Sequence, residues 1–106
     1  MTKYVLAYHG VSDMPDTEEA MGELMEAWGA WFGSMGDALL DGGNPIAGAR
    51  TVKGDGSVSD GGGANPLTGY SLIEADSFDA AVAIAKGCPV LANAESSVEV
   101  AEAIDM

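Results

Sequence analysis

The chain has 106 residues, of which 47% are apolar, and its 17 acidic and 4 basic side chains give a formal net charge of −13. The length suits one domain, residues 1–106, and the apolar content favours a folded chain over a disordered one. The acidic surplus repels nucleic-acid phosphates and anionic membranes, so we expect neither as a partner.

The cysteine content indicates the compartment. The single cysteine, Cys88, cannot form a disulfide within the chain, which favours a reducing, intracellular environment. It follows the predicted end of a helix, where no helix dipole would activate a thiolate. The first ten residues hold too short an apolar run for a signal peptide, and no stretch is long enough to span a bilayer. We therefore expect a cytoplasmic protein.

The first half of the chain predicts a strand and a long helix. Residues 3–9 alternate and are rich in Tyr, Val and Leu, which is typical of a strand. Asp16 with Glu19 three positions on, or Thr17 as the alternative cap, begins the helix. The apolar residues that follow have the three-and-four spacing of one amphipathic helix: Met21, Leu24, Met25, Trp28, Trp31, Phe32, Met35 and Leu39.

Four glycines, Gly22, Gly29, Gly33 and Gly36, share another side of this helix. Each costs about 1 kcal/mol of helix propensity relative to Ala. Either they admit the close approach of another backbone, or a well-buried helix merely tolerates them.

The second half predicts four strands and a second helix. The segment Asp41–Ile46 ends the first helix with a glycine cap and a proline stop. Strands are predicted over 46–52 and 57–59, joined by a hairpin turn at 53–56 whose Asp-Gly pair is typical of hairpins, and over 68–75 and 97–104. The second helix begins at Asp76 or Ser77, ends at Gly87, and buries Phe78, Ala81, Val82 and Ala85.

This order of elements, βαβ(β)βαβ, predicts a ferredoxin-like α+β domain with a mostly antiparallel sheet and an added hairpin. Two helices cover only one face of such a sheet. The other face also carries Val, Leu, Ile and Tyr, so we expect a second copy of the chain to bury it in a homodimer.

Three segments carry a resemblance to a known family. They are KYVLAYHG (3–10), AWGAWFGSMGDALLDGGNP (27–45) and VSDGGGANPLTGYSLIEADSFDAAVAIAKGCP (58–89). Together they resemble the YCII-related family, in the branch with a DGPF-type loop, over nearly the whole chain. The resemblance implies a ferredoxin-like fold that forms a dimeric α/β barrel.

The family is mostly uncharacterised, and the resemblance implies only a general chemistry. Some relatives are thought to use a His–Asp pair, and a few act on small ring compounds such as chlorinated hydroquinones. This sequence departs from the pattern at Gly62 and Gly63, where Pro-Phe would stand, and it has no histidine early in the first helix.

The candidate catalytic residues are His9 and Asp60. His9 is the only histidine, and its imidazole titrates near neutrality, which suits a general base; it could equally be a structural strand-end residue. Asp60 precedes three glycines. It could stabilise a turn, or it could stand at the rim of a site where glycine amides approach a ligand.

The candidate ligand-binding residues surround this pair. They are Tyr8, Trp28, Gly61, Gly62, Asn65 and Tyr70. The two tyrosines could place hydroxyls in an apolar cavity, and Trp28 belongs either to the core or to a pocket floor. The residue types do not form a zinc or iron site, and we expect neither a metal nor a cofactor.

Two functions remain open from the sequence. The first is a small-molecule enzyme or binder, in which the glycine loop walls a pocket containing His9 and Asp60. The second is a non-enzymatic dimeric interaction module, in which the loop and the glycine side of the helix serve assembly. The expected partners are a second copy of the chain and, for the first function, a small molecule.

Overall fold

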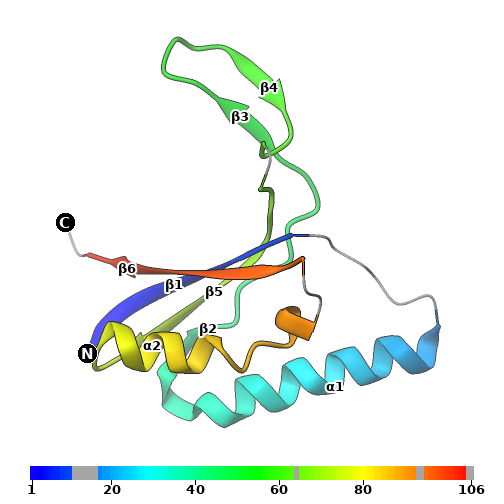
Figure 1. Ribbon diagram of the computed structural model, residues 1–106, viewed down its shortest axis with the longest axis vertical. Helices are drawn as coiled ribbons and strands as arrows, with labels where there is room; N and C mark the ends of the chain where they lie inside the picture. The colour runs from blue at the N-terminus through cyan, green and yellow to red at the C-terminus, as the bar shows by residue number, and fades with distance from the viewer. Residues whose placement is uncertain (11–16, 64, 93–94, 105–106) are drawn as a thin grey trace.

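The structure is a computed structural model that describes residues 1–10, 17–63, 65–92 and 95–104 (Figure 1). Its elements in chain order are β1 (Thr2–His9), α1 (Glu18–Met35), η1 (Gly36–Ala38), β2 (Leu39–Asp41), β3 (Arg50–Val52), β4 (Val58–Asp60), β5 (Leu67–Ala75), α2 (Phe78–Ala85), η2 (Pro89–Ala92) and β6 (Ser97–Ala103). The two η elements are single turns of 3₁₀ helix.

The main sheet has four strands in the order β2-β5-β1-β6, and every neighbouring pair is antiparallel. Strands β3 and β4 form a separate two-stranded hairpin. The predicted α+β class with an antiparallel sheet is therefore confirmed, and the strand order is consistent with a ferredoxin-like arrangement. Neither helix in the described part of the chain has both the length and the apolar character needed to cross a membrane.

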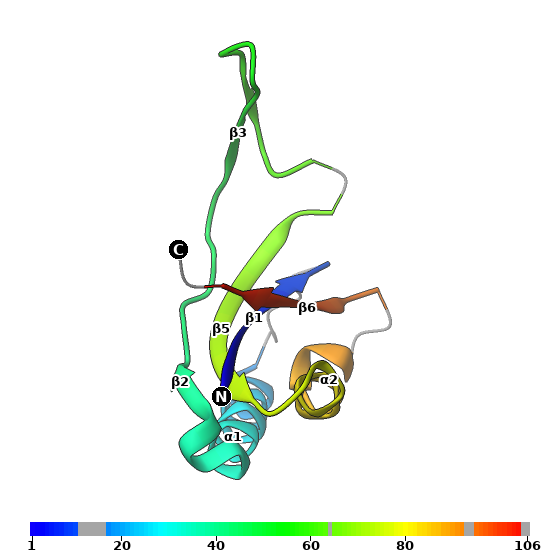
Figure 2. The same ribbon diagram turned by 90° about the vertical axis from the view of Figure 1, so that its left-hand side faces the viewer.

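Both helices lie on the same side of the sheet (Figures 1 and 2). Alternate β1 side chains, Tyr4, Leu6 and Tyr8, are buried toward the helices, as strand geometry requires of one face. The Trp31 indole N–H donates to the carbonyl oxygen of Ile84 at 3.1 Å and so connects α1 to α2. The core thus forms a single layer between the sheet and the helices, and it contains Tyr4, Leu6, Tyr8, Trp31, Ile73, Ala75, Ala81, Ala85 and Cys88.

Helix α1 begins where the sequence predicts but ends earlier. The hydroxyl of Thr17, the alternative cap, accepts from the Ala20 amide, while Asp16 lies outside the described residues. The predicted end at Asp41–Ile46 is wrong. Gly36, with φ of +56°, ends the helix, and Leu39 continues in β2 opposite Ile73. A left-handed glycine at this point outweighs the helical spacing of Leu39.

The hairpin is predicted correctly and its flanks are not. In the turn over residues 53–56, the Lys53 amide donates to the carbonyl of Ser57, and the Lys53 carbonyl accepts from the Gly56 amide. Gly56 has φ of +88°. The strand predicted over 46–52 is shortened to β3, because Ile46 donates instead to the carbonyl of Thr68. The chain before β3 therefore runs beside the start of β5.

Three side chains expected in the core are exposed in the single chain. Met25, Phe78 and Val82 have exposed fractions of 68%, 46% and 36%. In α2 the residues that pack inward are the small ones, Ala81 and Ala85. The alanines allow the helix to lie close to the sheet, so the larger side chains beside them stay partly exposed. Phe78 forms a T-shaped contact with Tyr4, with the two ring centroids 5.0 Å apart.

The glycine side of α1 has no close neighbour among the residues that the structure describes. A Cβ built at Gly22, Gly29, Gly33 or Gly36 would meet nothing within 4 Å. Gly43 is the opposite case: it has φ of +74°, and a Cβ there would overlap the carbonyl oxygen of Tyr70. A close backbone approach within the chain, one of the two alternatives for the α1 glycines, is found instead between Gly43 and β5.

These two environments give a matched pair of substitutions. We expect Gly43→Ala to lower the free energy of unfolding by more than about 2 kcal/mol, because it adds both a clash and a strained φ. Gly29→Ala should raise it by about 0.5–1 kcal/mol, through helix propensity alone. Urea unfolding of both variants measures this. A destabilised Gly29→Ala would mean that this side of α1 is covered after all.

Candidate functional site

The candidate functional site lies on the sheet face opposite the helices. Its β1 side chains are Lys3, Val5, Ala7 and His9, the alternates of the buried set. Strands β5 and β6, which flank β1, hold these residues in register with apolar neighbours such as Leu72 and Ala101. Among the described residues no other secondary-structure layer covers this face, which we call the open sheet face (Figure 2).

His9 lies at the end of β1 with its side chain only 13% exposed. Its Nδ1 is 3.1 Å from the carbonyl oxygen of Asn65, and its Nε2 is 3.1 Å from Oε1 of Glu99. A register shift between Tyr8 and His9 marks a bulge in the pairing with β5. Bulges of this kind redirect side chains, and here His9 bridges the glycine loop and β6.

The hydrogen bonds of His9 determine what it can do. A carbonyl and a carboxylate are both acceptors, so a neutral imidazole, with one N–H, could donate to only one of them. An imidazolium donates to both. In this arrangement the ring has no free nitrogen for accepting a proton from a ligand, and the group left facing solvent is the Glu99 carboxylate, which is 65% exposed.

Tyr70 and Glu99 stand on the two sides of Ala7. In the sheet register Ala7 is opposite Tyr70 of β5 and opposite Glu99 of β6. Directly paired residues share a face, and two strand spacings separate the outer pair by about 9.6 Å at the backbone. The small Ala7 side chain therefore forms the floor between a phenol and a carboxylate.

The Tyr70 hydroxyl is oriented from the β2 side. It accepts a hydrogen bond from the Asn44 side-chain amide at 3.1 Å. The close packing of Gly43 against the Tyr70 backbone fixes this neighbouring segment. The hydroxyl hydrogen stays available, so the site presents a donor on one side of Ala7 and an acceptor on the other.

Asp60 does not join His9 within the single chain. It ends β4 with a side chain that is 99% exposed, and its Oδ1 is 3.7 Å from Nε of Arg50 across the hairpin. The carboxylate that pairs with His9 is Glu99, a residue that the sequence reasoning did not single out. The alternation of residues 97–104 marks Glu99 as outward-facing, but only the register of β6 on β1 brings it beside the histidine.

The loop between β4 and β5, which we call the glycine loop, is anchored to the hairpin by hydrogen bonds of the Gly61 backbone. The Gly61 amide donates to the carbonyl of Ala49, and the Gly61 carbonyl accepts from the Thr51 hydroxyl at 2.8 Å. Gly61 has φ of +86°, while a Cβ at Gly62 would lie 3.4 Å from the Pro66 Cα. The predicted loop residue Asn65 reaches His9 through its carbonyl oxygen. The loop therefore closes the base of the hairpin and covers one side of His9.

Tyr8 and Trp28 lie on the helix side of the sheet, away from His9. The Tyr8 hydroxyl donates to Ser71 Oγ at 2.6 Å, and Ser71 Oγ donates to the carbonyl of Gly42 at 2.7 Å. The ring of Trp28 meets Tyr8 edge-on at 5.3 Å. Burial raises the pKa of Tyr8 to about 12, against the opposing effect of its hydrogen bond to Ser71. Tyr8, Ser71 and Trp28 therefore pack on the helix side of the sheet, behind the candidate site.

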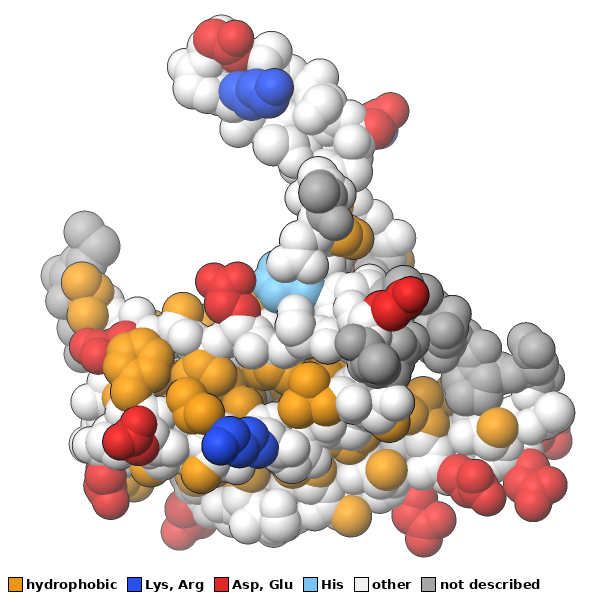
Figure 3. Space-filling view, viewed as in Figure 1, with side chains coloured by type: hydrophobic (Ala, Val, Ile, Leu, Met, Phe, Trp, Pro, Cys, Tyr) orange, Lys and Arg blue, Asp and Glu red, His pale blue; other side chains and the backbone are white. Residues whose placement is uncertain are grey.

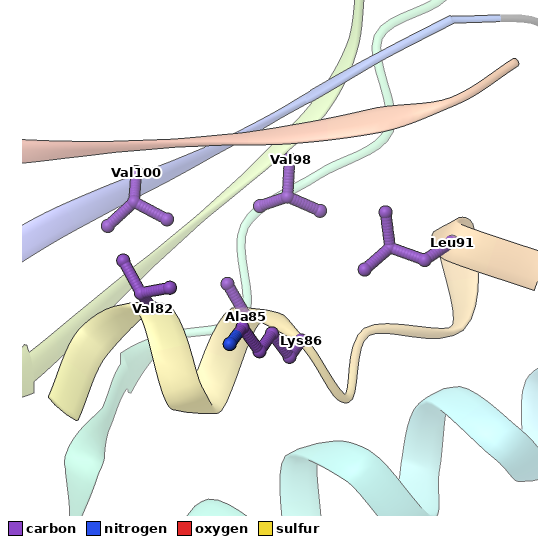
Figure 4. A pocket seen from close by; sticks show the side chains of 6 residues that line it. All are labelled: Val82, Ala85, Lys86, Leu91, Val98 and Val100. Carbon is purple, nitrogen blue, oxygen red and sulfur yellow. The ribbon is translucent and has the colours of Figure 1, made fainter. Parts of the chain in front are cut away.

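A separate shallow groove of about 340 Å³ lies between α2, η2 and β6 (Figure 4). Its lining is Val82, Ala85, Lys86, Leu91, Val98 and Val100. None of the predicted site residues line it. Cys88, buried nearby in the core, has a pKa raised to about 11 by burial, so its thiol is a poor nucleophile.

Two comparisons bear on identity and chemistry. Comparison with known protein families finds no match, and a search of curated proteins finds none. Within the described ranges no group of three or more His, Cys, Asp or Glu side chains could hold a metal ion. The structure establishes an α+β fold with an antiparallel sheet, and the YCII-related assignment stays a prediction.

The buried phenol of Tyr8 has a measurable consequence at high pH. Its folded pKa of about 12 lies above the ordinary value of 10.0, so the stability linked to this proton is complete below pH 10 and is lost as pH rises toward 12. We expect Tyr8→Phe to lose less stability than the parent between pH 10 and 12 in urea titrations. Cys88 titrates in both proteins and cancels. Parallel alkaline decline in the two proteins would contradict the burial of this hydroxyl.

Proposed function

We propose that the open sheet face binds a small, ring-containing hydroxyl compound between Tyr70 and Glu99. The observation that carries this proposal is the paired arrangement of His9 and Glu99 beside the apolar floor at Ala7. The His9 Nε2 lies 3.1 Å from one oxygen of the carboxylate, Oε1. The second oxygen is free to accept a hydrogen bond from the ligand hydroxyl.

The surroundings favour a neutral ring over an anion. The chain carries −13, and the carboxylate at the site adds a local negative charge that would repel an acidic ligand. An aromatic or saturated ring would lie on Ala7 and beside the phenol of Tyr70, with offset or edge contact to the tyrosine ring. The ring thus supplies the apolar contact and its hydroxyl supplies the polar anchor.

A second copy of the chain would complete the cavity. On a single chain the site is a shallow surface, and small-molecule sites are usually concave. A sheet packed face to face on the open sheet face would lie about 10 Å away and would leave room for a ring only where side chains are small, as at Ala7. The proposed functional unit is therefore a homodimer, whose two sheets together would form the barrel that the family resemblance implies.

The binding test uses NMR signals of the site itself. The probes are phenol and hydroquinone, with 1,4-dimethoxybenzene as the matched ring that cannot donate a hydrogen bond. We expect the hydroxylated rings to shift the Ala7 methyl and the His9 ring signals. We expect the dimethoxy ring to bind at least tenfold more weakly, because it cannot donate a hydrogen bond to the Glu99 carboxylate.

Two carboxylate variants distinguish the proposed pair from the one predicted by the sequence. Glu99→Gln should weaken hydroquinone binding at least tenfold, whereas Asp60→Asn, which makes the same charge change on the hairpin, should leave it within twofold. Equal loss in both variants would mean that Asp60 belongs to the site. Ring compounds that bind without shifting Ala7 or His9 would overturn the proposal.

A further inference from the structure

The hairpin of residues 49–61 projects from the body on the side away from the helices (Figures 1 and 2); we call it the arm. Its base is closed by the bond from the Gly61 amide to the Ala49 carbonyl. The Cα radius of gyration is 15.0 Å, compared with about 13 Å for a compact domain of this length. The arm therefore extends well beyond the folded layer.

The arm carries an apolar pair that touches little in its own chain. Val52 and Val58 are directly opposite each other, and they are 70% and 61% exposed. Each arm strand is paired only with the other in the described part of the chain. An isolated two-stranded hairpin is marginally stable in water, so such an arm needs contact with another surface.

The length of the arm suits a second sheet on the open sheet face. The valine pair lies two residues beyond Arg50 and Asp60, the first pair of the hairpin, which is about 7 Å along a strand. The tip, two residues further, lies about 14 Å from that first pair. Packed sheets are about 10 Å apart, and Figure 1 shows β3 and β4 standing wholly off the main sheet, so the arm is long enough to reach the level of a second sheet and to pass beyond it.

The charge distribution permits two acidic chains to meet on this side. The arm holds Arg50 and Lys53, two of the four basic residues, and also Asp55 and Asp60, so it is neutral. Helix α1 carries four glutamates and no basic residue, and it lies on the opposite side of the sheet. Figure 3 shows acidic side chains concentrated along the helix side. The four α1 glutamates are therefore directed away from the proposed contact, while the open sheet face itself carries Glu74 opposite Lys3 and Glu99 beside His9.

The area also argues that the sheet alone is a marginal interface. Strands β5, β1 and β6 are about 4.8 Å apart and average about eight residues, so they cover roughly 14 by 27 Å, and the short strand β2 brings the face to about 440 Å² per copy. Two such faces bury about 900 Å² in total, which is below the lower limit of about 1,000 Å² for a specific interface. Two arms would raise the total above this limit.

We propose that each arm clasps a second copy of this chain, with Val52 and Val58 packed against the partner's sheet layer. This inference rests on the homodimer in the proposed function, and it assigns to the arm the contact that holds the two copies together. It also assigns a role to the loop after Asp60, because the Gly61 backbone bonds to Ala49 and Thr51 close the base of the arm.

The test is the dimer dissociation constant from sedimentation over a concentration series. We expect the double variant Val52→Ser, Val58→Ser to dimerise at least tenfold more weakly than the parent. The matched control is Met25→Ser, which removes an equally exposed apolar side chain, 68% exposed, from α1. It should dimerise as the parent does.

A second measurement separates the arm from the dimer. In a mixture of valine-labelled and unlabelled chains, we expect intermolecular NOEs between the Val52 and Val58 methyls and protons of the partner chain. A parent that stays monomeric overturns both the dimer and the arm. A dimer in which the double variant binds normally and these NOEs are missing overturns the arm alone and leaves the binding site of the proposed function standing.

Discussion

Two helices can cover only one face of a four-stranded sheet, and every functional feature of this chain follows from that constraint. Helices α1 and α2 lie on the same side and bury Tyr4, Leu6, Ile73 and their neighbours. Because strand residues alternate, burial of one set turns the other toward the open side. That set combines apolar residues with a few polar groups, of which His9 and Glu99 are paired. A face of this composition suits contact with another molecule better than contact with water.

The helix-side core also determines the geometry of the open side. Tyr8, Ser71 and the carbonyl of Gly42 form a hydrogen-bonded chain that ties the central strands to the segment after β2. The same segment, through Asn44, orients the Tyr70 hydroxyl on the other face. A change in this buried hydrogen-bonded chain would therefore shift the proposed binding face without touching it.

Much of the fold could be predicted because its patterns are local. The alternation in β1 and β5, the Ser77 cap of α2 and the hairpin turn are each encoded within a few residues. The sequence does not predict strand β2, because its first residue, Leu39, continues the helical spacing of α1. Only the left-handed backbone at Gly36 separates the two elements. Short edge strands of this kind depend on their neighbours for their identity.

The contacts around His9 could be predicted only in part, because they depend on register. The sequence names His9 and Asn65 among the candidate site residues, and the structure places the His9 ring 3.1 Å from the Asn65 carbonyl oxygen. It cannot indicate that Glu99, ninety residues away, comes beside His9, since a slip of one residue in β6 would turn that carboxylate to the other face. Asp60 looked equally suitable in sequence, and the hairpin carries it to Arg50 instead.

The central claim is that the open sheet face is covered in solution by a second copy of the chain. Paramagnetic relaxation by a soluble gadolinium chelate tests it most directly, because the chelate broadens only the methyl signals that solvent reaches. If a second copy covers this face, we expect the Ala7 and Ala101 methyl signals to stay sharp and the Met25 methyl signal on α1 to broaden. Broadening of the two alanine methyls to the extent expected for a single chain would contradict it.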